Sequence, residues 1–321
     1  MSDNVHCVIA AVALPARGDA AAHSSNPVAT GPTLPNLKAL LAQLDAGPRL
    51  LLGEDSPAMP WEMRMARLSG LPGEPGRVPW AAHESGTRGT PCAWLTLCHW
   101  DVGTDHVLLA SPGALAVDEG TAAALHASMA PYFLEDGITL EPHPARPGVW
   151  LATGELFRHL ACMSLDRVIG RRLTRNFFEA TDDASKTIRR LQNEMQMLLY
   201  THPANDRRAD EGLPPVNSFW ITGAGVLDEA ATPLPGMLLL EQRLQEPALR
   251  HDAAAHAQAW RDIDASTCAD LLARMKAGQY IQLSLCGELA AHDYSAQPRG
   301  AWARATQLFK RGPDLRFMDN L

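Results

Sequence analysis

The chain has 321 residues, of which 46% are hydrophobic and 20% are charged, so it is long enough for two domains or for one domain with a large insertion. Its 28 basic and 36 acidic residues leave a net charge of -8, which excludes the overall positive field of a nucleic-acid-binding protein. No apolar run approaches the roughly 20 residues that a membrane span requires, and no basic segment precedes the apolar start as it would in a signal peptide.

The six cysteines are distributed singly, without a CxxC pair, and most of them lie in apolar segments. This spacing matches neither a zinc ribbon nor a disulfide framework. We therefore expect reduced, buried thiols in a cytoplasmic protein that contacts neither a membrane nor nucleic acid.

The N-terminal part of the chain carries one strand signal and two helix signals. Residues 6–14 (HCVIAAVAL) form an apolar run of the length typical of a central parallel strand. Helical spacing of apolar residues recurs in residues 34–44, which begin with Leu-Pro-Asn, and again in residues 62–71. Residues 72–91 are rich in Gly and Pro, which predicts irregular chain.

The middle of the chain alternates strand and helix signals. Residues 92–99 (CAWLTLCH) predict a strand and residues 121–129 a helix. Residues 138–140 and 148–152 complete a strand–helix–strand pattern that is typical of a small α/β module. Residues 186–199 carry one apolar stripe with charged residues outside it, which predicts a further helix.

The last third of the chain adds two strands and a helix. Residues 217–221 predict a strand that ends in the glycine-rich turn TGAG at 222–225. Residues 253–277 have one apolar helical face, and residues 279–285 (QYIQLSL) predict a strand between two glycines. The alternation of strands and helices along the chain indicates an α/β fold.

The run HPANDRR (residues 202–208) places an imidazole, an amide, a carboxylate and two guanidinium groups directly after the helix at 186–199. Such groups could hold a phosphate, because guanidinium groups bind phosphate oxygens in pairs. The alternative is a helix cap, with His202 near the C-terminal dipole, Pro203 ending the helix and Asn205 in a turn. The glycine-rich turn could likewise present backbone N–H groups to an anion, or could be a tight turn only.

Two groups of residues have the chemistry of metal ligands. The segment CHWDVGTDH (residues 98–106) holds two histidines and two aspartates, which could bind a divalent ion or form a polar turn at a strand end. Asp252 and His256 are four residues apart and so share one face of a helix, as helical metal pairs do, although a solvated pair has the same spacing. No nucleophile elbow, Walker sequence or HExxH motif is present, so spacing alone names no reaction.

Residues 198–225 as a whole follow an ordered pattern. A helix ends in His-Pro-x-Asn-x-x-Arg, and a glycine, an asparagine, an apolar strand and a glycine-rich turn follow. This pattern resembles the archaeal-type cofactor-independent phosphoglycerate mutases of the alkaline-phosphatase-like superfamily. The Leu-Pro-Asn start at residue 34 also resembles a helix start of that superfamily. The chain as a whole is similar to the proteobacterial RpfE-type regulatory proteins.

The resemblance implies an α/β alkaline-phosphatase-like core domain, built from residues 1–88 and 212–321 around a central, mostly parallel sheet. A smaller α/β domain, residues 89–211, would be inserted into it. Working members of the superfamily hold two divalent ions and use a Ser nucleophile. Here no Asp ends the first strand, Met63 stands where the Ser is expected with Ser56 nearest, and the Asp-His-Gly motif falls on residues 286–288 (CGE).

We therefore expect a catalytically degenerate phosphoglycerate mutase-like protein with a regulatory or protein-interaction role, no cofactor, and an anionic metabolite as a candidate ligand. The anion-binding residues would be His202, Asn205, Arg207, Arg208, Asn217, Gly223 and Gly225. The alternative is a divergent phosphomutase or phosphatase that acts on a small phosphorylated metabolite with Mn, Zn or Mg. Its metal ligands would come from His99, Asp101, Asp105, His106, Asp252 and His256. A third alternative is a structural partner subunit without a ligand.

Overall fold

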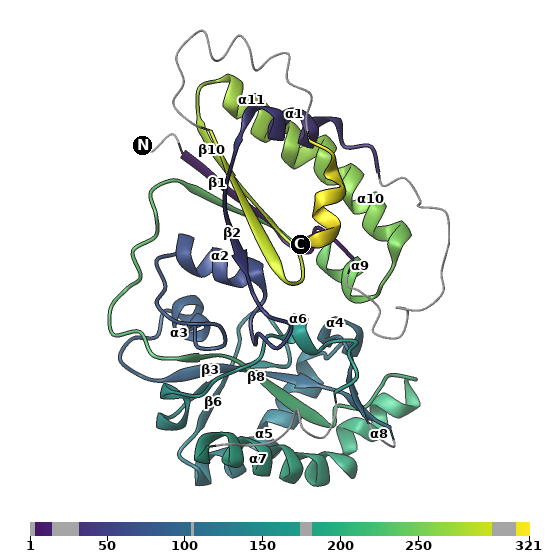
Figure 1. Cartoon of the computed structure of the whole chain (residues 1–321). Coiled ribbons are helices and arrows are strands. Elements are labelled where there is room, and N and C mark those ends of the chain that lie inside the picture. The colour runs from purple at the N-terminus through teal and green to yellow at the C-terminus, as the bar shows by residue number, and fades with distance from the viewer. Residues whose placement is uncertain (1–3, 15–31, 104–105, 174–181, 297–312) are drawn as a thin grey trace. The chain divides into compact units, whose positions relative to one another are not determined.

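The computed structural model describes residues 4–14, 32–103, 106–173, 182–296 and 313–321, and within them the chain has a mixed α/β fold (Figure 1). The chain divides into two compact units. Unit 1 comprises Met1–Ser69 and Pro233–Leu321, and unit 2 comprises Gly70–Thr232. None of the described helices is long and apolar enough to cross a membrane.

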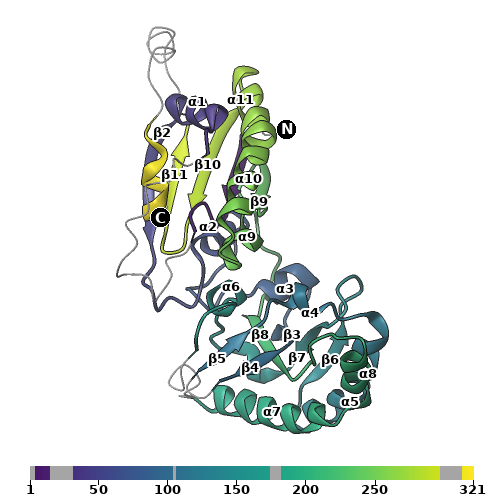
Figure 2. The same ribbon diagram turned by 90° about the vertical axis from the view of Figure 1, so that its right-hand side faces the viewer.

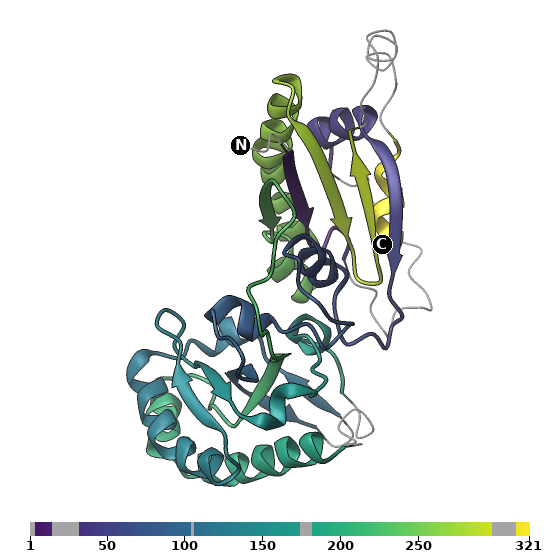
Figure 3. The same ribbon diagram turned by 90° about the vertical axis from the view of Figure 1, so that its left-hand side faces the viewer.

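Unit 1 is built on a five-stranded sheet of order β2-β11-β10-β1-β9, whose strands lie side by side in Figure 3. The central strand β1 (Asn4–Ile9) is parallel to β10 (Tyr280–Cys286) and to β9 (Met237–Glu241). Strand β11 (Ala290–Ser295) is antiparallel to both β10 and the edge strand β2 (Asp45–Leu51). The expected parallel strands therefore form the middle and one edge of a mixed sheet.

Helices cover the two faces of this sheet unequally. Val5, Cys7 and Ile9 of β1 alternate along the strand and belong to the core cluster under the helices of one face. These helices are α1 (Pro35–Gln43), α9 (Gln245–Leu249), α10 (Ala253–Ile263), the π-helical segment η3 (Asp264–Cys268), α11 (Ala269–Lys276) and η4 (Leu315–Asn320). Val8 faces the other side, where α2 (Pro60–Leu68) packs.

The start of α1 is capped from a distant part of unit 1. Its N-cap residue, Leu34, has no capping side chain. Instead, the carboxylate of Asp264 accepts hydrogen bonds from the backbone N–H groups of Asn36 at 3.2 Å and Leu37 at 2.7 Å. These donors would otherwise lack partners, so the buried carboxylate replaces a local cap. The Leu-Pro-Asn start of α1 is thereby joined to η3.

Unit 2 is built on a four-stranded antiparallel sheet of order β6-β7-β3-β8. Its strands are β3 (Cys92–Cys98), β6 (Thr139–Pro142), β7 (Val149–Thr153) and β8 (Ser218–Gly225). The long helices α5 (Glu119–Glu135) and α7 (Asp183–Tyr200) pack on this sheet and share one apolar core with it (Figure 2). Shorter elements complete the unit: α3 (Trp80–Ser85), β4 (Trp100–Val102), β5 (Val107–Leu109), α4 (Pro112–Leu115), η1 (Glu155–Arg158), α6 (Leu165–Val168) and α8 (Pro203–Asp210).

The two compact units divide at 69/70 and 232/233, whereas the sequence predicts domain boundaries at 88/89 and 211/212. The difference has a physical origin in β8. This strand pairs with β3 over its whole length, so residues 212–232 belong with unit 2. Residues 70–88 also belong there, because α3 packs against β8 and β3. The Gly/Pro-rich segment 72–91, expected to be irregular, contains this helix.

Candidate functional site

The HPANDRR run starts a separate helix. Helix α7 ends at Tyr200, and the run supplies the N-cap and most of the residues of α8 (Pro203–Asp210). His202 is its N-cap and Pro203 its first residue, a position that suits proline because the missing N–H is not needed there. The imidazole Nδ1 accepts a hydrogen bond from the N–H of Ala204 at 3.1 Å, so Nε2 carries the proton and donates to Ser128 Oγ at 2.9 Å. Burial, and then the charge of Arg207, lower the pKa of His202. The neutral ring therefore acts as a helix cap.

Asn205 and Arg208 hold the loop that follows α8. The Asn205 amide donates to the carbonyls of Leu199 at 2.8 Å and Val216 at 2.7 Å, and its Oδ1 accepts from the N–H of Val216 at 2.8 Å. Arg208 is 2% exposed and donates from Nε to the Pro214 carbonyl at 3.0 Å. Its Nη2 donates to the carbonyl of Leu115. Both side chains thus satisfy buried backbone groups of their own fold.

Arg208 also retains a buried donor. Its Nη1 has no hydrogen-bond partner within the described parts of the chain, and burial lowers the pKa of its guanidinium. Arg207, in the last turn of α8, is exposed to solvent. Of the two guanidinium groups in the run, Arg207 is therefore the one that a dissolved anion can reach.

Asn217 and the two glycines lie at opposite ends of β8. Asn217 precedes the strand and exchanges hydrogen bonds with the backbone of Trp100, at 2.7 Å and 2.8 Å. Gly223 and Gly225 lie within β8 itself, near its far end, instead of in a turn after it. Because a strand rises about 3.3 Å per residue, eight residues separate Asn217 from Gly225 by about 25 Å. The run 202–208 and the glycines are therefore not brought together.

The glycines allow α3 to approach β8 closely. Gly223 has φ +63, and a Cβ at this position would lie 2.9 Å from Cβ of Trp80. Gly225 has φ +154, and a Cβ there would lie 2.8 Å from Cβ of Pro79. No L-residue with a side chain fits such contacts without displacing α3.

The residues predicted as metal ligands are divided between the two units. In unit 2, His99 Nδ1 donates to the Pro215 carbonyl at 2.8 Å, and Asp101 is exposed in the hairpin of β4 and β5. His106 lies beside Gly103 at that hairpin, and Asp105 lies outside the described residues. In the described ranges, no group of three or more His, Cys, Asp or Glu residues has a geometry that could hold a metal ion.

Asp252 and His256 belong to unit 1, where both have structural partners. Asp252 caps α10 by accepting a hydrogen bond from the N–H of Ala255 at 2.9 Å. His256 is buried and donates from Nε2 to the carbonyl of Ala11 at 2.9 Å. Burial lowers the pKa of His256. Of the pair predicted from its helical spacing, Asp252 therefore caps α10, and His256 ties α10 to the segment that follows β1.

The carboxyl ends of β1 and β10 are where an α/β sheet ordinarily presents its ligand site. Ala10–Val12 follow β1 directly. Trp260 of α10 donates from Nε1 to the Val12 carbonyl at 3.0 Å, and the N–H of Val12 donates to the carbonyl of Cys286 at 3.0 Å. At the end of β9, Glu241 accepts from Arg243 Nε at 2.8 Å. These described backbone and side-chain groups at the edge are thus bonded to one another.

A buried polar cluster on the α2 face of the sheet is a feature that spacing does not reveal. Arg64 of α2 forms an ion pair with Asp293 of β11 at 3.1 Å, and Asp293 accepts from Ser284 Oγ at 2.7 Å. Both partners of the ion pair are less than a tenth exposed. Arg64 lies more than 200 residues before Ser284 and Asp293, which are nine residues apart. No motif in the sequence links Arg64 to this pair.

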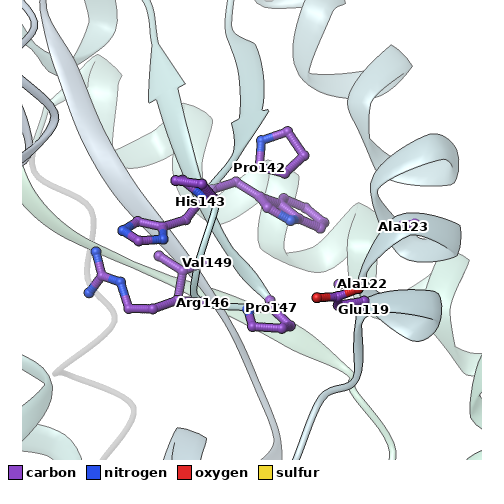
Figure 4. Close-up of a pocket in the computed structure, with 11 residues that line it drawn as sticks. Glu119, Ala122, Ala123, Pro142, His143, Arg146, Pro147 and Val149 are labelled. Atoms are coloured by element: carbon purple, nitrogen blue, oxygen red, sulfur yellow. The ribbon is translucent and has the colours of Figure 1, made fainter.

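A hollow of about 150 Å³ lies in unit 2 between the β6–β7 turn and the start of α5 (Figure 4). Figure 4 shows Arg146 and His143 on one side of it and Glu119 on the other. The Arg146 guanidinium lies 5.0 Å from the ring centroid of Trp94, and Trp94 Nε1 donates to Glu84 at 2.8 Å. Pockets for small molecules ordinarily measure about 300–1,000 Å³, so this hollow has room for one small group.

Comparisons with known proteins find similarity among solved structures only. No protein-family profile matches the chain, and no curated protein matches it. Among solved structures, the chain is similar to a cofactor-independent phosphoglycerate mutase from Thermoplasma acidophilum, at 14% identity and a TM-score of 0.35, over 99% of this chain and 94% of that one. It is also similar to the PH0037 protein from Pyrococcus horikoshii, at 11% identity and a TM-score of 0.43, over 91% and 87% of the two chains.

Proposed function

We propose that the chain is a phosphoglycerate mutase-like protein of the RpfE type that performs no phosphoryl transfer and has a regulatory or protein-interaction role. Unit 1 would be its alkaline-phosphatase-like core. The observation that carries the proposal concerns the carboxyl ends of β1 and β10, where backbone groups bond to side chains of α10 and to each other. A two-metal centre needs several carboxylate and imidazole ligands at such an edge. Among the described residues, the ends of β1 and β10 present Ala10–Val12 and Cys286, and α10 is tied to this edge through His256 and Trp260. The neighbouring Glu241 is bonded to Arg243.

The proposal includes a cytoplasmic location. All six cysteines are unpaired and buried. Burial raises the pKa of Cys7 and of Cys162 to about 12, so these thiols stay protonated at neutral pH. Unpaired, unreactive thiols suit a reducing compartment, which supports this part of the proposal.

The proposal also includes an anionic metabolite as a ligand of the α8 segment. Arg207 is exposed there, and the buried Arg208 adds a positive charge one residue away. A guanidinium at this position can form paired hydrogen bonds to phosphate oxygens. Because Asn205, Arg208 and Asn217 hold the backbone, Arg207 would supply the direct contact.

Metal content and thermal melting test the catalytic part of the proposal. We expect the purified protein to contain no stoichiometric Mn or Zn. We also expect its melting temperature to stay the same when Mn, Zn or Mg is added. We also expect no turnover of phosphoglycerates or phosphate esters. Asp252→Asn is a suitable variant, because Asn caps α10 as well as Asp does. Metal-dependent stabilisation that Asp252→Asn or Asp105→Asn removes would instead establish the divergent metalloenzyme.

Melting in the presence of inorganic phosphate and 3-phosphoglycerate tests the ligand. We expect an increase in melting temperature that Arg207→Ala removes and that Arg250→Ala, an exposed arginine of unit 1, leaves intact. Identical melting curves with and without these anions would contradict anion binding. A pull-down with the wild-type chain would then test the protein-interaction role by itself.

A further inference from the structure

Residues 313–321, which we call the strap, lie against the β10–β11 hairpin of unit 1 (the yellow ribbon that ends at C in Figure 1). The strap consists mainly of η4, a 3₁₀-helix of six residues. Met318 is 7% exposed and Leu321 is 4% exposed, and both belong to the core of unit 1. Five of the nine strap residues are instead exposed to solvent. The strap is therefore attached to the unit through few side chains.

One oxygen atom of the strap serves the turn between β10 and β11. The carbonyl oxygen of Leu321 accepts hydrogen bonds from the N–H groups of Leu289 at 2.7 Å and Ala290 at 2.5 Å. Backbone N–H groups that lose contact with water need acceptors, and these two successive donors find theirs outside the hairpin. The strap thus completes the hydrogen bonding of this turn.

Gly287, at the start of the same turn, makes room for the strap. A Cβ at this position would overlap the carbonyl carbon of Leu321 and lie 2.7 Å from its Cβ. The φ angle of Gly287 lies outside the left-handed region, so the backbone itself does not require glycine here. Its N–H group closes the turn by donating to the Ala290 carbonyl at 2.9 Å. The strap, and not the turn, therefore requires a residue without a side chain.

Phe317 contacts the hairpin through ring packing. Its ring centroid lies 6.3 Å from that of His292 and 6.0 Å from that of Tyr294. The hydroxyl group of Tyr294 and Nδ1 of His292 form a hydrogen bond of 2.9 Å with each other. Neither polar group depends on Phe317, so withdrawal of that ring would leave both of them bonded. Release of the strap would cost only apolar contact area here.

The hairpin is held together without the strap. Strands β10 and β11 pair from Gln282 to Cys286, and the N–H group of Leu52 donates to the Leu289 carbonyl at 2.8 Å. The strap cannot support itself in the same way, because a 3₁₀-helix of six residues is too short to be stable alone. Keeping nine residues in one conformation also costs conformational entropy. Release of the strap would therefore break few interactions and leave the sheet intact.

We propose that the strap is displaceable, so that the native chain exchanges between a closed and an open state. In the open state the strap is unfolded and the five-stranded sheet is unchanged. Opening frees the N–H groups of Leu289 and Ala290, which follow the carboxyl end of β10. Strands of α/β sheets ordinarily present their ligands at this end, so the strap controls access to it. Opening requires neither a metal centre nor Arg207 and is thus independent of the proposed function.

Native-state hydrogen exchange of the full chain tests the proposal at the two donor amides. We expect Leu289 and Ala290 to exchange at least about tenfold faster than amides within β10, such as those of Leu283 and Leu285. Low urea concentrations should leave this exchange unchanged, because opening of the strap exposes little surface. Protection equal to that of β10, with the same urea dependence, would mean that the strap leaves only on global unfolding and would overturn the proposal.

Gly287→Ala should shift the equilibrium toward the open state, because the added methyl group overlaps Leu321. We expect exchange of Leu289 and Ala290 to accelerate at least about tenfold beyond the wild type. Gly53→Ala is the matched control and should exchange as the wild type does. Gly53 also lacks a positive φ, and a Cβ there meets nothing within 4 Å. Unchanged protection of both amides in Gly287→Ala would overturn the proposal.

Leu321→Ala tests the same equilibrium from the side of the strap and does not alter the hairpin. It removes most of a buried side chain, so we expect Leu289 and Ala290 to exchange at least about fivefold faster. Asn320→Ala, at an exposed neighbouring position, should have no effect. Amides of β10 should keep their wild-type rates in both variants. An equal increase at every amide would mean that the strap and the sheet unfold together, which would overturn the proposal.

Discussion

Unit 1 buries Arg64, unit 2 buries Arg167 and Arg208, and the fold stabilises Arg64 and Arg208 in different ways. In unit 1, the Arg64 guanidinium is neutralised by the carboxylate of Asp293, which also accepts a hydrogen bond from Ser284. In unit 2, Arg208 donates to the backbone carbonyls of Pro214 and Leu115, and no described carboxylate forms an ion pair with it. The first arrangement joins a helix to two strands through charge. The second uses the donors of a guanidinium to hold irregular backbone.

The largest effect is expected from removing the charge that neutralises Arg64. Asp293→Asn keeps the shape and the acceptor for Ser284 but leaves a buried cation uncompensated. We expect the free energy of unfolding to fall by about 3–5 kcal/mol, measured by urea denaturation. Arg64→Met combined with Asp293→Asn removes both charges and should recover most of the loss. A loss below about 1 kcal/mol for Asp293→Asn alone would contradict a neutralising role.

A smaller effect is expected from Arg208→Met, because no opposite charge is left behind. The variant removes the donors of the Leu115 and Pro214 carbonyls, and unsatisfied buried carbonyls cost about 1–3 kcal/mol. The exposed neighbour variant Arg207→Met is the matched control, and its effect should stay within about 0.5 kcal/mol. If Arg208→Met destabilised the protein more than Asp293→Asn does, the contrast between the two arginines would fail.

The close approach of α3 to β8 gives the third effect. Gly223 and Gly212 have similar φ values, +63 and +71, but a Cβ at Gly212 meets nothing within 4 Å, whereas a Cβ at Gly223 meets Trp80. Alanine at either position therefore carries the same backbone strain, and only Gly223→Ala adds a clash. We expect Gly223→Ala to cost about 1–3 kcal/mol more than Gly212→Ala in urea denaturation. Equal losses would mean that α3 yields to the added methyl group.

The sequence predicts those elements of the fold whose burial is periodic. The helix expected at residues 186–199 is α7, and the apolar run at 92–99 contains β3. The strand expected at 6–14 is only partly right, because β1 ends at Ile9 and shares residues 6–9 with the run. Strand β2 (DAGPRLL) gave no strand signal, because it is a mostly exposed edge strand that contains Gly and Pro. Helix α8 is not predicted either, because Pro203 has two meanings in a sequence. Proline can end one helix, as the sequence analysis assumes, and it also suits the first residue of the next helix.

The roles of the polar side chains were harder to predict than the elements, because their partners lie far away in the sequence. Arg208 bonds to Leu115, and the amide of Asn36 bonds to Asp264, 228 residues away. Only the folded chain brings these groups together. The residue types of a run such as HPANDRR are equally suited to an external anion and to internal carbonyls. The fold, through burial, assigns Asn205 and Arg208 to the internal carbonyls and leaves Arg207 in solvent.

The smallest effect concerns pH and distinguishes the cap of α8 from a charged anion site. Burial and Arg207 lower the pKa of His202 below its usual value near 6.5, so the folded protein prefers the neutral ring. The unfolded chain therefore binds a proton first as pH falls. The stabilisation is complete above about pH 6.5 and is lost as pH decreases from there through the lower pKa of the folded state.

The protonated ring cannot accept the N–H of Ala204, so the cap is lost at low pH. We expect the free energy of unfolding to decrease by about 0.5–1 kcal/mol more in the wild type than in His202→Asn between pH 7.5 and 5.5. Asparagine caps a helix without titrating, and the other histidines contribute equally to both proteins. If His202 instead served mainly as a cation for an anionic ligand, the ligand-free wild type and variant would lose stability in parallel. Urea denaturation at the two pH values therefore separates a structural histidine from a ligand-binding one.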